Sequence, residues 1–375
     1  MPANVFTIPS SAAFADTLAR GLIKRLGTGP LALADAVIYL PTRRAQRTFG
    51  DAFARVLGGA GLLPQFKALG DVDEDEFLFE AEALDLPPAI APMRRSLLLA
   101  TMIRRWSEKA RGRAMGFAQA SALADGLAQV MDEVETQGVS IADLEVPGTL
   151  AEHWEDVRVL LTLLETEWPN ILAAEKRISP ADRRNRALRA LAEQLKKTPP
   201  KGPVIAAGST GSIPVTAALM HVIAELPNGS VVLPGLDREL DETSWNALDP
   251  GHPQFGLKQL LERLGVARKD VKDWDGARDT QRERLLREAL RPAPTTDAWR
   301  AIAEGSGTAE IKKGLKAPET KAWNDLQQIW SERPEALPLL DFTSVVWVDR
   351  HLKVEPSALG LYLTTPGPAA WTWSP

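Results

Sequence analysis

The sequence predicts an α/β fold in which a parallel sheet is interrupted by a mostly helical region. Residues 203–237 contain an apolar run, a Gly-Ser-Thr-Gly-Ser turn, a helical stretch and a second apolar run that ends on an Asp. This is the pattern of a strand, a helix and a strand. Residues 4–57 alternate in the same way, and residues 93–196 look helical. Turns of βαβ units lie at the carboxyl edge of a parallel sheet, where ligands of α/β proteins usually bind.

Four elements are expected at the amino terminus, namely a β-like run at 4–9, a helix ending near Leu26, an apolar run at 36–40 and a helix at 45–57. Ser10 or Ser11 is expected to cap the first helix, because a hydroxyl can accept a hydrogen bond from an N–H of the first turn. Residues 58–92 are rich in Gly, Pro and acidic residues, and we expect them to form connecting structure.

The clearest helix of the central region carries one apolar stripe at steps of three and four, made by Leu150, Trp154, Val157, Leu161, Leu164, Trp168 and Ile171. We interpret its tryptophans as core residues. Asp132 and Glu133 follow an apolar run, but their Ala/Leu-rich surroundings predict a helix rather than an acidic nucleotide site. Later helices are expected to end at Leu264 and Leu290.

These patterns divide the 375 residues into four parts. The first part of the α/β domain is 1–92, the helical insertion is 93–200, and the α/β domain continues at 201–304. Residues 305–375 form a divergent, tryptophan-rich tail with weak periodicity, and both a small extra unit and a poorly ordered end stay open for it. A chain of this length exceeds the size at which one core keeps growing, so several domains are expected.

The composition and the charge distribution exclude several classes of protein and of site. The net charge of -5 argues against a uniformly basic nucleic-acid binder, but residues 91–113 carry a charge of +6 and residues 182–201 carry +5, whereas 71–85 holds eight carboxylates. Such segments are usually solvated helix faces. The chain has no Cys, which excludes disulfides and thiolate metal sites, and its four His are far apart in sequence. With no signal peptide or long apolar run, we expect a soluble cytoplasmic protein without a metal or cofactor.

The turn formed by Gly208, Ser209, Thr210, Gly211 and Ser212 is the best candidate for a ligand site. Glycines permit positive φ and a close backbone approach, while hydroxyls can bond phosphate oxygens. The same spacing also fits a purely structural tight turn. A nucleotide-hydrolysing loop would need Gly-Lys-Ser/Thr, and the chain contains no Gly-Lys pair.

A second candidate is Thr42, Arg43 and Arg44 at the end of the second apolar run. An Arg offers a bidentate fork for a backbone phosphate, although an Arg pair at a helix start is usually just solvated. If both turns lie at the same sheet edge, they support each other. Asp237 in Leu-Asp-Arg is similar to a nuclease carboxylate, but the expected Asp-Tyr-Lys partner is missing.

Several segments, taken in order, resemble the amino-terminal helicase-like region of AddB, the second subunit of the AddAB helicase–nuclease, in its alphaproteobacterial form. They cover roughly residues 4–300 and include VFTIPSSAAFADTLARGL, VIYLPTRRAQRTF, ISPADRRNRAL, PVIAAGSTGSIPVTAALM, VVLPGLD and HPQFGLKQLLERLGV. GSTGSIP and VVLPGLD are the most specific of them.

The resemblance implies a superfamily-one helicase-like (P-loop-NTPase-like) fold, a role in double-strand-break repair by recombination, and an AddA-type partner that carries the ATP motor. It also implies that Thr42, Arg43, Arg44, Gly208, Ser209 and Thr210 contact the DNA backbone. Where related subunits can carry a phosphate loop, this chain has Ile-Pro-Ser-Ser-Ala-Ala at 8–13, without the Lys, so we expect no ATP hydrolysis. The nuclease half of the family would follow the point where this chain stops or diverges.

Two other hypotheses stay open. One is a small-molecule α/β enzyme that binds a phosphorylated ligand at the turn after residue 207. The other is a truncated fragment that keeps the fold but has no function.

Overall fold

The computed structural model describes residues 4–27, 31, 33–58, 61–69, 86–140, 151–275 and 281–299. The acidic segment 71–85 and the tail 305–375 lie outside the described residues. Within the described residues, no helix combines the length and the apolar character needed to cross a bilayer.

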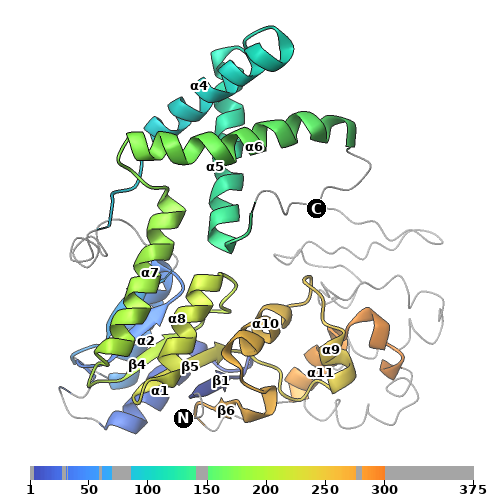
Figure 1. Ribbon diagram of the computed structural model, residues 1–375. Coiled ribbons are helices and arrows are strands. Elements are labelled where there is room, and N and C mark those ends of the chain that lie inside the picture. Colours follow the sequence, from blue (N-terminus) through green and yellow to red (C-terminus); the bar gives the residue numbers. More distant parts are fainter. Residues whose placement is uncertain are drawn as a thin grey trace, which may run out of the picture. The chain divides into compact units, whose positions relative to one another are not determined.

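Six parallel strands form one sheet in the order β3-β2-β4-β5-β1-β6 (Figure 1). Their bounds are β1 Val5–Ile8, β2 Val37–Leu40, β3 Gln65–Ala68, β4 Val204–Ala207, β5 Gly229–Pro234 and β6 Lys272–Asp273. The predicted α/β class with a parallel sheet is therefore confirmed. Strands β2, β4 and β5 are short apolar runs with buried side chains, as expected of strands covered on both faces.

The helices follow the strands in chain order. They are α1 Phe14–Leu26, α2 Arg43–Leu57, α4 Pro92–Arg111, α5 Phe117–Gln137, α6 Ala151–Ala174, α7 Pro180–Lys197, α8 Pro214–Glu225, α9 Glu242–Asn246, α10 Phe255–Leu264 and α11 Gln281–Ala289. Between β3 and β4 the described elements are all helices, α4 to α7.

The chain divides into two compact units that both contribute strands to the sheet. The first unit comprises residues 1–4, 35–46 and 64–231, and the second comprises 5–34, 47–63 and 232–375.

In the first unit, α4, α5 and α6 enclose an apolar cluster that includes Leu99, Ile103, Leu164 and Trp168 (Figure 1). Trp168 is 3% exposed, so the interpretation of this tryptophan as a core residue is confirmed; the side chain of Trp154 lies outside the described ones. Helix α7 packs on α5 and α8, and its buried residues include Leu188 and Leu191.

A polar junction joins α4, α5 and α7. Arg95 is 5% exposed and donates to Asp132 at 2.7 Å, and the Ser179 hydroxyl that caps α7 also donates to Glu135. Burial raises the pKa of Glu135; the charges of Asp182 and Asp132 act in the same direction, while Ser179 and Arg95 oppose them. Asp132 thus serves a structural ion pair on a helix, as its surroundings predict.

In the second unit, α1 packs beside Trp274, whose indole N–H donates to the carbonyl of Leu18 at 3.2 Å. Gly21 lies against the same indole, and a side chain at that position would overlap the ring. The guanidinium of Arg25 stacks on the ring at 3.5 Å and donates to the Trp274 carbonyl.

Two local predictions are wrong. Among the described residues no side chain caps α1, which begins at Phe14 after Ala13; Ser10 and Ser11 instead donate to Glu283, far away in sequence. The region expected to be connecting structure contains β3, because this edge strand is only half-buried and gives a weak apolar pattern.

Candidate functional site

The two turns singled out in the sequence follow neighbouring strands of the first unit. Strands β2 and β4 pair in parallel, with Ile38 opposite Ile205 and Tyr39 opposite Ala206. The turns after β2 and β4 therefore leave the same edge of the sheet side by side.

This edge is a topological switch point. The chain leaves β2 for β3 on one side, whereas it leaves β4 for β5 on the other side, as the strand order requires. Connections that diverge from two adjacent parallel strands open a crevice between their carboxyl ends, which is where open α/β sheets bind ligands. Topology thus gives these turns a position that their local sequences could not specify.

The turn after β2 leads directly into α2. The Thr42 hydroxyl accepts from the backbone N–H of Ala45 at 3.2 Å, so Thr42 is the N-cap, and Gln46 donates to the Phe66 carbonyl of β3. Arg43 and Arg44 occupy the first turn of α2, which contains no acidic residue of its own, at the end of the helix where the helix dipole disfavours cations.

The turn after β4 is built on two glycines in the left-handed region. Gly208 has φ 74° and Gly211 has φ 59°, and the hydroxyl of Ser209 accepts from the Gly211 N–H at 3.2 Å. Thr210 and Ser212 are exposed. Helix α8 then begins at Pro214, and among the described residues no side chain caps it. Its positive end therefore lies at the same edge as the arginines.

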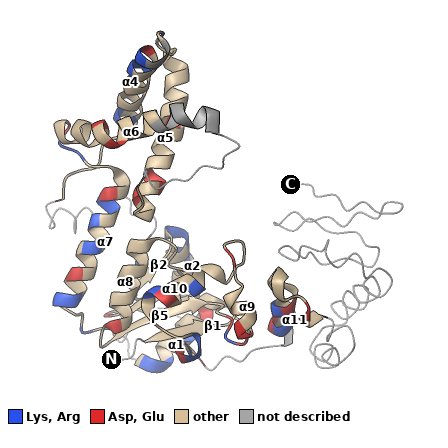
Figure 2. Ribbon diagram, turned by 45° about the vertical axis from the view of Figure 1, so that its right-hand side comes forward, with Lys and Arg blue, Asp and Glu red and all other residues tan. Residues whose placement is uncertain are grey.

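The Lys and Arg side chains of the charged helices were expected to be exposed to solvent, and only some of them are. Figure 2 shows Lys and Arg residues recurring along α7, and Arg186, Lys196 and Lys197 are exposed there. Arg95 of α4 and Arg183 of α7 are instead buried, with 5% and 8% exposure. The net charge of a segment could not reveal which of its arginines face the interior.

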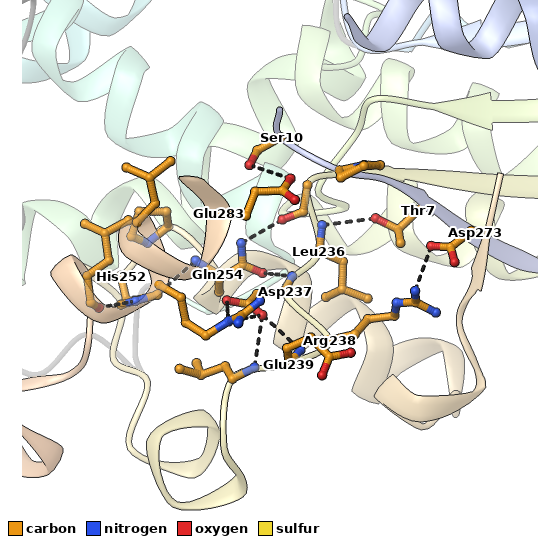
Figure 3. A pocket seen from close by; sticks show the side chains of 17 residues that line it. Thr7, Ser10, Leu236, Asp237, Arg238, Glu239, His252, Gln254, Asp273 and Glu283 are labelled. Carbon is orange, nitrogen blue, oxygen red and sulfur yellow. Dashed lines mark hydrogen bonds and ion pairs between the residues drawn. The ribbon is translucent and has the colours of Figure 1, made fainter. Parts of the chain in front are cut away.

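A second concave site lies in the second unit, where β1, β5 and β6 end. It is a cavity of about 260 Å³ lined by residues of the β1 turn, the β5 turn and α11 (Figure 3). The Thr7 hydroxyl joins the two strand ends, since it donates to the Leu233 carbonyl and accepts from the Leu236 N–H. Of this site, sequence reasoning singled out only Asp237 and the β1 turn.

Charged groups in this cavity pair with one another. Arg287 donates to both oxygens of Asp237, and Arg238 donates to Asp273 at 2.7 Å. Glu283 accepts from Ser10 and Ser11. With Glu239 also in the lining, four carboxylates face two guanidinium groups, which gives a net charge of 2 − 4 = −2 with His252 neutral.

His252 has a defined hydrogen-bonding arrangement. Its Nδ1 accepts from the backbone N–H of Gln254 at 3.0 Å, and its Nε2 lies 2.7 Å from the Leu290 carbonyl. With Nδ1 as the acceptor, Nε2 is the ring nitrogen that faces the carbonyl oxygen of Leu290. This ring ties the end of α11 to the loop before α10. The Gln254 amide completes the wall by bonding Gly235 and Asp237.

The acidic lining does not form a metal centre. In the part of the chain that the structure describes, no group of three His, Cys, Asp or Glu residues is placed to hold a metal ion. Comparison with protein-family models and with curated proteins finds no match to this chain.

Proposed function

We propose that this protein is a DNA-binding and scaffolding subunit with a helicase-like fold, and that it grips the DNA backbone at the carboxyl edge of β2 and β4. The observation that supports the proposal is the parallel pairing of these strands. Because of it, the turn with Thr42, Arg43 and Arg44 and the turn with Gly208, Ser209, Thr210 and Ser212 leave the same edge of the sheet. Two turns with complementary means of binding phosphate thus share one switch point of the sheet.

The two turns suit a polyanion. Guanidinium groups at the start of α2 can pair with phosphate oxygens in a bidentate manner, and the hydroxyls and N–H groups between β4 and α8 can donate to a neighbouring phosphate. The successive phosphates of a nucleic-acid backbone can engage the donors of both turns at once. This favours a nucleic-acid backbone over a small phosphorylated ligand.

The wider role follows from the resemblance to AddB. On that basis we infer that the chain acts in recombinational repair of double-strand breaks and that an AddA-type subunit supplies the ATP motor. The missing Lys in residues 8–13 supports the inference that this chain does not hydrolyse ATP itself.

The test is the binding of a fluorescent single-stranded oligonucleotide, measured by anisotropy over a range of salt concentrations. The variant Arg43→Ala/Arg44→Ala is expected to bind at least about tenfold more weakly at low salt, with a salt slope smaller by roughly two. The matched control is Lys196→Ala/Lys197→Ala, which removes the same charge from the same unit. These lysines end α7 just before β4 begins, so they lie toward the amino edge of the sheet and should contribute little.

Equal losses in the two double variants would show that binding depends on net charge alone and would contradict this site. Tight binding of inorganic phosphate that Ser209→Ala abolishes, without DNA binding, would favour the small-molecule enzyme. Co-purification with an AddA-type subunit tests the scaffolding role, and a folded protein that binds neither DNA nor this partner would be a fragment without function.

A further inference from the structure

The turn after β1 binds a carboxylate of the protein itself, that of Glu283. One oxygen of Glu283, Oε1, accepts from the Ser11 N–H at 3.1 Å and from the Ser11 hydroxyl at 3.0 Å. The same oxygen accepts from the Ser10 hydroxyl at 3.3 Å (Figure 3). A backbone N–H and two hydroxyls between a strand and the next helix are the donors that bind phosphate oxygens in α/β proteins. A carboxylate can occupy them because it also presents an anionic oxygen.

At the end of the neighbouring strand, β5, a cationic side chain pairs with an acidic one. Asp237 follows β5, the sheet neighbour of β1, and Arg287 Nε lies 2.8 Å from each of its carboxylate oxygens. Both side chains are largely buried, with 11% exposure for Arg287 and 16% for Asp237. In phosphate-loop proteins, a carboxylate after a core strand holds the magnesium ion that accompanies the phosphates. Here a guanidinium group neutralises that carboxylate.

The anionic and the cationic side chain come from the same helix. Glu283 and Arg287 are four residues apart on α11, so they project from the same face one turn apart. The two receiving turns lie close together. The backbone N–H of Gly235 donates to the Ile8 carbonyl at 2.8 Å, and a Cβ added to Gly235 would lie 3.3–3.6 Å from atoms of Ser10. One helix face thus satisfies the anion-binding turn and the acidic strand end together.

We propose that α11 is an internal substitute for a magnesium–phosphate ligand and that it closes this site to nucleotides. Glu283 takes the position of a phosphate and Arg287 takes the position of the metal ion. The remaining lining carries a net negative charge, which further disfavours a polyphosphate. This inference concerns the β1–β5 site alone and does not depend on DNA binding at the β2–β4 edge.

The experiment compares the effect of inorganic phosphate on thermal unfolding of the full chain with that of sodium chloride at equal ionic strength. In Glu283→Ala, 10 mM phosphate is expected to raise the unfolding midpoint by about 2 °C more than in the wild type, because the vacated donors can bind the anion. Glu288→Ala is the matched control: it removes the same charge from the same helix and breaks an ion pair with Arg291, but it leaves the β1 turn filled. Its response to phosphate should equal that of the wild type.

Calorimetry with Mg-ATP provides the second readout, and the wild type is expected to show no binding at millimolar concentration. If Glu283→Ala does not fold, Glu283→Gln keeps the shape and one acceptor oxygen, and it should respond to phosphate more strongly than the wild type does. Wild-type binding of Mg-ATP with a Kd below about 1 mM would overturn the proposal. An equal phosphate response in the wild type, the Glu283 variants and Glu288→Ala would also overturn it.

Discussion

Arg287 donates through Nε to both carboxylate oxygens of Asp237, each at 2.8 Å, although the two residues are fifty positions apart. The same carboxylate accepts from the backbone N–H groups of Glu239 and Leu240, each at 3.0 Å. The pair therefore fixes the turn after β5 and the position of α11 at once.

Because this pair is largely buried, removing one partner leaves a poorly solvated charge. We expect Asp237→Ala and Arg287→Ala each to lower the free energy of unfolding by about 2–3 kcal/mol. The double variant should lose less than the sum, with a coupling of roughly 1–3 kcal/mol. Urea unfolding of the four proteins measures the cycle. Additive losses would mean that the two charges do not interact in solution.

The left-handed glycines after β4 give a second prediction. Alanine at Gly208 or Gly211 should cost about 1–2 kcal/mol, since a Cβ disfavours positive φ, and should weaken DNA binding by distorting the turn. Gly126 in α5 is the control: among the described atoms nothing lies within 4 Å of an added Cβ, and alanine there should stabilise by roughly 0.5–1 kcal/mol. Thermal unfolding measures both changes. Stabilisation by Gly208→Ala or Gly211→Ala would contradict the turn geometry.

The raised pKa of Glu135 leads us to expect that the stability of the protein depends on pH. Burial raises the pKa of this carboxyl in the folded state, so between its unfolded and folded pKa values the folded protein binds more protons than the unfolded chain. Its contribution to stability therefore falls as the pH rises through this window. Glu135→Gln removes the charge and keeps an acceptor for the Ser179 hydroxyl. The variant should unfold at a higher temperature than the wild type at pH 8, and the difference should shrink toward pH 4.

The exposed neighbour Glu133 provides the control for this measurement, and Glu133→Gln should change the midpoint little at either pH. A lower midpoint for Glu135→Gln at pH 8 would show that the charged form of Glu135 stabilises the junction.

Asp241 predicts the opposite behaviour at low pH. Burial alone would raise its pKa, but hydrogen bonds from Ser244 and Arg291 outweigh burial and lower the pKa to about 2. The stabilisation is present above the unfolded value of 3.8 and is lost as the pH falls toward 2. Asp241→Asn, which keeps an oxygen to cap α9, should lose less stability between pH 4 and pH 2. Thermal unfolding across this range, with Asp249→Asn as the exposed control, checks the prediction.

The sequence by itself determined the α/β class, the parallel arrangement and the type of most elements. The apolar runs at 36–40 and 203–207 are short and are followed by turn residues, which favours buried strands, and the stripe containing Leu161, Leu164 and Trp168 indicates a helix. These are local properties, because they depend on residues only a few positions apart. The edge strand β3 was not predicted, because a half-buried strand of four residues has only a weak apolar pattern.

The tertiary structure alone decided which distant residues meet. The sequence could propose Arg43 and Ser209 separately, but only strand pairing placed their turns at one edge. Likewise, Ser10 and Ser11 looked like helix caps until the fold brought the Glu283 carboxylate to them from more than 270 positions away. The physical reason is that a hydroxyl or an N–H can donate to any suitable acceptor within reach. The sequence shows the donor, and only the folded chain selects the acceptor.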